Sequence, residues 1–209
     1  MTVKLWSCLR SFNSLNHLNI SDSYLSFPPY PPELPSVLKL SAEKVTSQSY
    51  KGVISSLPRL RVIDITIDDA ERDIPQIMAG LRRSYTGGQR LAYIKLTAPS
   101  SLPLEKKRVR SETLKKLGLL IREQTKNLQR LDLLGVKGTG EEDLVNLIES
   151  CRLVKSMSFV LLESCRTTEG GLLEFHLKDL QTSSGDLSVL VYHDDKLQDE
   201  KSYSISHIG

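Results

Sequence analysis

Few residues of the sequence have the types and spacing that catalysis requires. The run His193-Asp194-Asp195 has groups that bind metals or transfer protons, but one histidine beside two aspartates in a polar segment is typical of a simple turn. The glycine-rich stretch 135–140 lacks the spacing of a phosphate-binding loop, and a turn followed by a capped helix explains it better. Neither a Ser/His/Asp nor a Cys/His arrangement has recognisable local context. We therefore expect no catalytic residue, no cofactor and no metal, and we do not expect an enzyme.

Two other segments have the composition of binding motifs. Residues 106–110, Lys-Lys-Arg-Val-Arg, form a basic cluster with Lys115 and Lys116 that is compatible with a nuclear localisation signal or an anion-binding patch. We favour a solvated loop and outer helix face. Residues 27–35 contain five prolines with PxxP spacing, but no flanking Arg or Lys orients docking on an SH3 domain. We expect a stiff extended loop there, because proline is not accommodated in a helix interior.

A short motif, apolar-x-x-apolar-x-apolar, recurs along the chain and predicts strands. The copies are Leu15-Leu18-Ile20, Leu60-Ile63-Ile65, Leu91-Ile94-Leu96, Leu128-Leu131-Leu133, Val154-Met157-Phe159 and Leu187-Leu190-Tyr192, with a weaker copy at Leu38-Leu40. Most of these strands alternate apolar and polar residues, which indicates a sheet with one buried face and one solvated face. The copies are irregularly spaced, with a mean of about 29 residues, near the range of leucine-rich repeats.

The polar face of these strands is the predicted binding site. Taken in register, its central positions are Asn19, Lys39, Asp64, Lys95, Asp132, Ser158 and Val191. Neighbouring parallel strands lie about 4.8 Å apart, so the four charged positions are expected side by side with alternating sign. Tyr93 and Arg130 lie beside this ladder and are residue types enriched at binding hot spots. The ladder is either a solvated surface that satisfies its own charges or a recognition surface, and both interpretations stay open.

Apolar stripes at helical spacing lie between the strands. They are Tyr50-Val53-Ile54-Leu57, Ile74-Ile77-Met78-Leu81, Leu114-Leu117-Ile121, Leu144-Leu147-Ile148 and Leu173-His176-Leu177-Leu180. Strands that alternate with helices predict an α/β protein with a parallel sheet. A doubly wound sheet, which has helices on both faces, would have strands that are apolar throughout. The alternating strands favour a solenoid with helices on one side only.

We expect one domain over residues 1–209. Leu5, Leu9 and Phe12 have helical spacing before the first strand, which indicates the helix of an incomplete repeat, as in a fragment of a longer solenoid or a minimal cap. About nine residues separate Leu187–His193 from Tyr203–Ile208, too few for a parallel crossover. We therefore expect an antiparallel hairpin over residues 187–209 that closes the edge of the sheet.

The composition is that of a soluble globular protein, with 39% hydrophobic and 25% charged residues. The net charge of +3 gives no reason to expect nucleic acid or an anionic membrane as a partner. No apolar run approaches the roughly 20 residues of a membrane span. The three cysteines, Cys8, Cys151 and Cys165, do not suggest a disulfide scaffold or a zinc site, so we expect a reducing, cytoplasmic setting.

Residues 128–159 resemble a repeat of the ribonuclease-inhibitor-like class of leucine-rich repeats. The resemblance is carried by Asn127-Leu128-x-x-Leu131-x-Leu133, by Gly138 to Leu144, by Leu147-Ile148 and by Val154-x-x-Met157-x-Phe159. It extends more weakly over residues 12–192 and is similar in style to the C-terminal repeats of NOD-like (NACHT–LRR) immune receptors. It implies a horseshoe with a parallel sheet on the concave side and helices on the convex side. The asparagine position of the family holds Ser23, Glu43, Asp68, Pro99, Val136 and Leu162 instead.

The resemblance implies an interaction module that recognises a protein or another macromolecular ligand, or other domains of its parent chain, as in a NOD-like innate immune receptor. One alternative is a leucine-rich adaptor, such as a substrate-recruiting subunit of a ubiquitin ligase, which would have an F-box-like helical segment. Another is a small α/β nucleotide-binding or hydrolytic domain, with its site beyond the carboxyl ends of the strands. Those ends have acidic groups such as Asp68 and Asp69, but no glycine-rich phosphate loop.

Overall fold

The computed structural model describes residues 3–21, 31–43, 47–84, 91–124, 128–136, 141–150, 156–162, 187–192 and 202–205. The helices are α1 (Val3–Arg10), α2 (Ser47–Ser55), α3 (Ala70–Ser84), α4 (Leu104–Lys107), α5 (Ser111–Gln124) and α6 (Glu141–Ser150). The strands are β1 (His17–Ser21), β2 (Lys39–Glu43), β3 (Val62–Thr66), β4 (Tyr93–Thr97), β5 (Arg130–Val136), β6 (Ser156–Leu162), β7 (Leu187–Tyr192) and β8 (Ser202–Ile205). Outside the described residues lie the predictions for Cys151, Cys165, His193-Asp194-Asp195, the stripe 173–180 and the glycines at 138 and 140.

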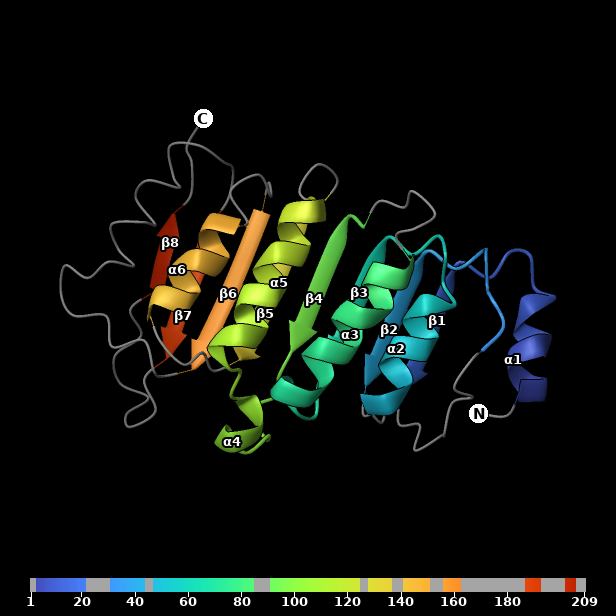
Figure 1. Cartoon of the computed structure of the whole chain (residues 1–209), viewed down its shortest axis with the longest axis horizontal. Coiled ribbons are helices and arrows are strands. Elements are labelled where there is room, and N and C mark those ends of the chain that lie inside the picture. The colour runs from blue at the N-terminus through green and yellow to red at the C-terminus, as the bar shows by residue number, and fades with distance from the viewer. Residues whose placement is uncertain are drawn as a thin grey trace.

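The strands form one sheet in which spatial order follows chain order, from β1 to β8 (Figure 1). Each pair from β1–β2 to β6–β7 is parallel, whereas β7 and β8 are antiparallel. The predicted α/β class with a parallel sheet is confirmed, and so is the antiparallel pairing at the C-terminal end. The sheet lacks the reversal of strand order that a doubly wound fold requires.

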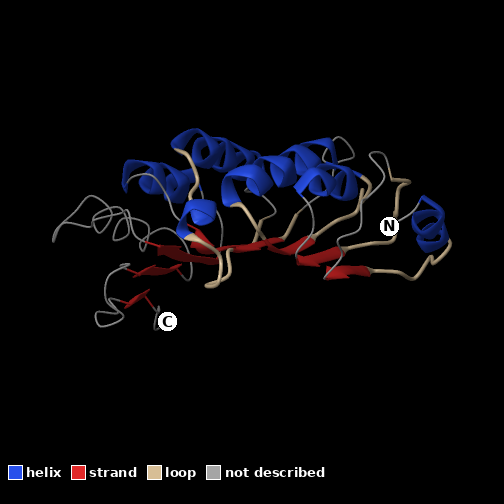
Figure 2. Cartoon of the chain, turned by 90° about the horizontal axis from the view of Figure 1, so that it is seen from below, coloured by secondary structure: helices blue, strands red, loops and turns tan. Residues whose placement is uncertain are grey.

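Helices α2, α3, α5 and α6 cover one face of the sheet, and no helix among the described residues covers the opposite face (Figure 2). The alternation of side chains along each strand explains this layering. In β3, Ile63 and Ile65 are fully buried beneath the helices, whereas Asp64 between them is only half-buried on the other side. Burying such an apolar side chain contributes roughly 1.5–3 kcal/mol. The core therefore lies between the sheet and the helix layer.

The register corrects two of the predicted ladder positions. Leu40, rather than Leu38, lies opposite Leu18 and Ile63, so Ser41 takes the central polar position that was predicted for Lys39. The motif in this repeat is Val37-x-x-Leu40-x-Ala42, all three buried, and the small alanine at the last position obscured it. In β7, Leu187 lies opposite Met157 and Ser188 opposite Ser158, so the prediction of Val191 is also wrong.

The predicted apolar stripes of α2, α3 and α5 are buried against the sheet. The buried residues are Tyr50, Val53, Ile54, Leu57, Ile74, Ile77, Met78, Leu81, Leu114, Leu117 and Ile121. Close approach between helices is made possible by glycine. A Cβ on Gly80 of α3 would lie 2.8 Å from the Cβ of Ile54, and one on Gly118 of α5 would lie 2.8 Å from Oγ of Ser150 in α6. A larger residue at Gly80 would push α2 and α3 apart, whereas one at Gly118 would first displace the hydroxyl of Ser150.

The N-terminal segment differs from its predicted stripe. Phe12 lies beyond the end of α1 and is 57% exposed, whereas Trp6 is fully buried. The Nε1–H of Trp6 donates to the carbonyl oxygen of Pro32 at 2.6 Å. This bond ties the first helix to the described part of the proline-rich segment, residues 31–35, which contains no helix.

Candidate functional site

The predicted site residues lie on the face of the sheet that none of the described helices covers. We call the polar-side residues of β2 to β5 the open face. In successive strands they are Lys39, Ser41 and Glu43; Val62, Asp64 and Thr66; Tyr93, Lys95 and Thr97; and Arg130, Asp132 and Leu134. Because residues i and i+2 of a strand share a face, each strand contributes three side chains to this surface.

The charged ladder is present over three strands. Asp64 lies opposite Lys95, and Lys95 lies opposite Asp132. The ammonium of Lys95 is 3.3 Å from Oδ1 of Asp64, and each side chain is about one-third exposed. Such a pair on the surface contributes roughly 0.2–1 kcal/mol. The predicted alternation of charge is therefore confirmed for these three residues.

Tyr93, Arg130 and Asp132 form a connected cluster at the β4–β5 boundary. The hydroxyl of Tyr93 donates to Oδ2 of Asp132 at 2.6 Å. Nε–H of Arg130 donates to both carboxylate oxygens, at 3.1 Å to Oδ1 and 3.0 Å to Oδ2. The guanidinium also lies over the ring of Tyr93, 5.3 Å from its centroid, in the geometry of a cation–π contact. The sequence placed these three residues near one another, and the structure brings them into direct contact.

Asp132 is the centre of this cluster, since its side chain is only 4% exposed. A buried carboxylate without partners is strongly unfavourable, so the two donors compensate its loss of water. Burial, the hydrogen bond to Asp132 and the charge of Asp132 raise the pKa of Tyr93 to about 12, although the charge of Arg130 acts in the opposite direction. The hydrogen bonds and the charge of Asp132 likewise raise the pKa of Arg130.

Arg130 is held in place while half of its side chain stays accessible. Its side chain is 52% exposed, and its bonds to Asp132 use Nε alone. Within the described part of the chain, the two terminal nitrogens of this guanidinium have no hydrogen-bond partner. They are donors in a fixed plane, the geometry that suits a carboxylate of another molecule.

Lys39 does not join the charged ladder. It lies opposite Val62, in the row that continues through Tyr93 to Arg130. Lys39 and Arg130 therefore lie at the two ends of this row, and Val62 and Tyr93 lie between them. The row spans three strand spacings, about 14 Å.

Two polar groups of the sheet were not predicted from the sequence. The hydroxyl of Ser41 lies 3.0 Å from Nε2 of His17, which links β2 to β1. Oγ1 of Thr97 is buried and has no hydrogen-bond partner among the described residues. Both side chains follow the same alternation as Tyr93 and Lys95, so counting in steps of two from those residues would have found Thr97.

The acidic residues that follow β3 have structural roles. Asp69 accepts a hydrogen bond from the backbone N–H of Arg72 at 3.1 Å and caps α3. Asp73 is fully buried and accepts from the backbone N–H groups of Asp68 and Asp69, at 2.9 and 3.1 Å. Burial raises the pKa of Asp73, whereas these hydrogen bonds lower it. Of the two residues considered for an α/β enzyme, Asp69 thus engages its carboxylate at a helix N-terminus, and Asp68 donates its backbone N–H to Asp73.

Two further features concern the described part of the chain, a metal site and a membrane-spanning helix. No group of three or more His, Cys, Asp or Glu residues there is arranged to hold a metal ion. None of the helices described has the length and apolar character needed to cross a bilayer.

Comparison with known proteins gave no match. No protein-family model, no curated protein and no solved structure matched this chain.

Proposed function

We propose that this chain is an irregular leucine-rich-repeat solenoid whose open face binds a protein partner. Strands in chain order, helices on one face and the recurring apolar motif support a horseshoe with the open face on its concave side. The sequence pattern of the repeat at residues 128–159 supports the narrower proposal that the chain belongs to the C-terminal repeats of a NOD-like innate immune receptor. The few cysteines of the sequence support a cytoplasmic setting.

The cluster of Tyr93, Arg130 and Asp132 is the observation that carries this proposal. Tyrosine and arginine are enriched among the residues that dominate binding energy, and rigid side chains lose little entropy when a partner binds. Asp132 fixes Arg130, and Arg130 covers Tyr93. The open face thus presents a pre-ordered pair of anchors rather than two mobile side chains.

A pull-down with a matched control tests the proposal. The variant Tyr93→Ala/Arg130→Glu removes both anchors. The control Phe12→Ala/Arg10→Glu makes the same two kinds of change at exposed positions outside the open face. We expect partners captured by the wild type to be lost from the first variant and kept by the control. Retention of every partner by Tyr93→Ala/Arg130→Glu would rule out the open face as the binding surface.

The milder variant Tyr93→Phe guards against loss of folding. It keeps the ring and the guanidinium contact, so it is expected to retain partners while losing only the hydrogen bond to Asp132. Thermal melting of each variant establishes whether it is folded before its binding is compared.

A further inference from the structure

A second charged surface lies on the helix side of the molecule. Residues 104–116, which we call the basic segment, comprise α4 and the first turns of α5. The segment has six Lys or Arg and two Glu, a net charge of +4, whereas the whole chain has a net charge of +3. The rest of the chain is therefore nearly neutral. The excess positive charge of the protein is concentrated in the basic segment.

The basic segment is anchored to the fold through alternate residues. Lys106, Arg108 and Arg110 are exposed, whereas Lys107 and Val109 between them are buried. Nζ of Lys107 donates to the carbonyl oxygen of Ser100 at 3.0 Å. Within residues 106–110, considered with Lys115 and Lys116 as a localisation signal, only three residues therefore face solvent. The exposed cations form a row along a backbone that is anchored to the fold.

Most cations of this row have no partner in the part of the chain that the structure describes. Among the described residues, Lys106, Arg108 and Lys115 form neither a hydrogen bond nor an ion pair through their side chains. Arg110 lies 3.8 Å from Glu71 and its side chain is 81% exposed, so this contact is weak. Lys116 is the exception, because its ammonium is 2.6 Å from Glu112.

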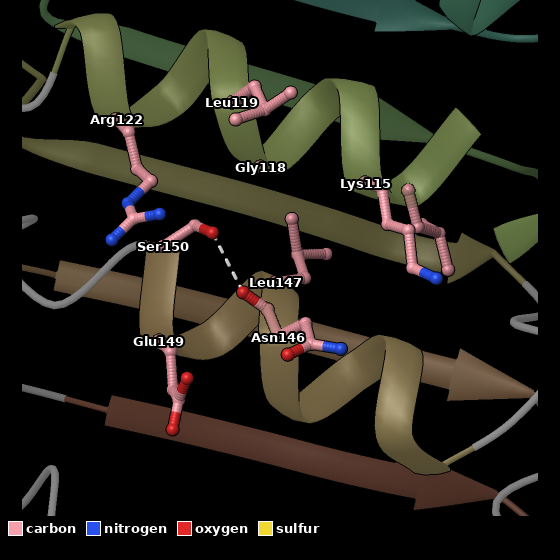
Figure 3. Close-up of a pocket in the computed structure, with 9 residues that line it drawn as sticks. Lys115, Gly118, Leu119, Arg122, Asn146, Leu147, Glu149 and Ser150 are labelled. Atoms are coloured by element: carbon pink, nitrogen blue, oxygen red, sulfur yellow. Dashed lines mark hydrogen bonds between the residues drawn. The ribbon is translucent and has the colours of Figure 1, made fainter. Parts of the chain in front are cut away.

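A groove of mixed lining begins where the row of cations ends, with apolar Leu114, Leu119 and Leu147 beside polar residues that include Lys115, Arg122, Asn146, Glu149 and Ser150. It has a volume of about 240 Å³ and lies between α5 and α6, with Lys115 and Leu119 on one wall and Asn146 on the other (Figure 3). Leu119 is 53% exposed, one of two large hydrophobic residues with high exposure in the described part of the chain. Lys115 therefore borders both the row and the groove.

We propose that the basic segment and this groove together bind an acidic peptide segment of a partner protein. The carboxylates of the peptide would pair with Lys106, Arg108 and Lys115, and an apolar side chain would contact Leu119. Arg108 has extended backbone angles, φ −69° and ψ 138°, and exposed residues alternate with buried ones from Lys106 to Arg110. An extended peptide likewise presents alternate side chains on one side.

Charge and composition favour a peptide over a nucleic acid. Residues 99–123 contain no aromatic residue, so the segment lacks the stacking platforms that bind single-stranded bases. Glu105 and Glu112 lie among the cations and would repel a continuous phosphate backbone. A peptide with separate carboxylates and an apolar residue matches both the gaps in the row and the groove beside it.

Fluorescence anisotropy with the full chain tests this site. The probe is a fluorescein-labelled peptide in which glutamate alternates with valine and which ends in two leucines. We expect binding that weakens as sodium chloride is added, because the contacts are between exposed charges. Lys106→Glu/Arg108→Glu should weaken binding roughly tenfold or more, and Leu119→Ser about threefold. The matched reversal Arg10→Glu/Arg59→Glu, at exposed positions elsewhere, should change it less than about twofold.

Three results would overturn the proposal. The first is unchanged binding by Lys106→Glu/Arg108→Glu or by the neutral Lys106→Gln/Arg108→Gln. The second is equal binding of the same peptide with glutamine in place of glutamate. The third is tighter binding of an oligothymidylate or of phosphatidylserine vesicles than of the acidic peptide. Because this surface is separate from the open face, its failure would leave the proposed function untouched.

Discussion

The open face and the basic segment differ in how their charged side chains are paired. On the open face each carboxylate of the ladder has a cation, since Asp64 pairs with Lys95 and Asp132 with Arg130. In the basic segment six cations accompany only two carboxylates. The first arrangement lowers the cost of burying charge and fixes side chains in place. The second leaves charge available to another molecule and adds little to the stability of the fold.

Burial explains this contrast. Asp132 is nearly inaccessible, so its charge requires partners within the protein. Lys106 and Arg108 are exposed, so water solvates them whether or not they are paired. We therefore expect substitutions on the open face to affect both folding and binding, and substitutions of the exposed cations Lys106 and Arg108 to affect binding alone.

The largest expected effect is that of Asp132→Ala. It removes the acceptor of the bonds from Tyr93 and Arg130, and hydrogen bonds to charged groups contribute roughly 1.5–3 kcal/mol. We expect the free energy of unfolding in urea to fall by about 2 kcal/mol. Asp64→Ala is the matched control and should cost less than about 1 kcal/mol, because its pair is partly exposed. Equal losses for the two variants would contradict the distinction between buried and exposed carboxylates.

The second largest effect is expected in the pH dependence of stability, through the raised pKa of Tyr93. Its pKa in the folded state is about 12, above the usual value of 10.0, so the folded state favours the neutral hydroxyl. This contribution to stability is complete below pH 10 and is lost as the pH rises towards 12. The tyrosinate absorbance of the wild type minus that of Tyr93→Phe isolates this residue. A midpoint near the usual value would show that the hydroxyl is not held by Asp132.

The anchor of the basic segment gives a smaller, local effect. Lys107→Ala removes a buried side chain and its bond to Ser100, and a single hydrogen bond contributes about 1 kcal/mol. We expect trypsin to cleave after Arg108 and Arg110 several times faster than in the wild type. Lys106→Ala, an exposed neighbour, is the control and should leave these cleavage rates unchanged. Similar rates for both variants would mean that Lys107 does not anchor the segment.

The smallest effect is expected for Lys106→Glu/Arg108→Glu. Neither side chain has a partner in the described part of the chain, so the free energy of unfolding should change by less than about 0.5 kcal/mol. Urea denaturation measures this directly. A loss as large as that of Asp132→Ala would show that these cations stabilise the fold, contrary to the contrast between the two surfaces.

The sequence predicted the layers of the fold because strand and helix periodicities differ. Alternation in Ile63-Asp64-Ile65 and the stripe Ile74 to Leu81 each specify one buried face, which requires helices on one side of the sheet. The weaker repeat at β2 was placed two residues early. Its last apolar position is Ala42, whose small side chain carries little hydrophobic signal.

The site was predicted as a set of neighbours, but not as a cluster with defined contacts. Tyr93 lies opposite Arg130, and this pairing could be predicted by aligning the repeated motif of the two strands. The burial of Asp132 could not, since it depends on how side chains from two strands cover it. The anchoring of the basic segment was equally hidden, because the bond from Lys107 to Ser100 depends on the path of an irregular loop.

Photo-crosslinking tests the central claim, that the open face binds a protein, most directly. Val62 lies on the open face between Lys39 and Tyr93, and Phe12 is an exposed residue outside it. Benzoylphenylalanine is placed at one or the other position in the full chain, and the protein is irradiated in cells. We predict covalent protein adducts from position 62 and none above background from position 12. Adducts from position 12 alone would contradict the assignment of the open face as the interaction surface.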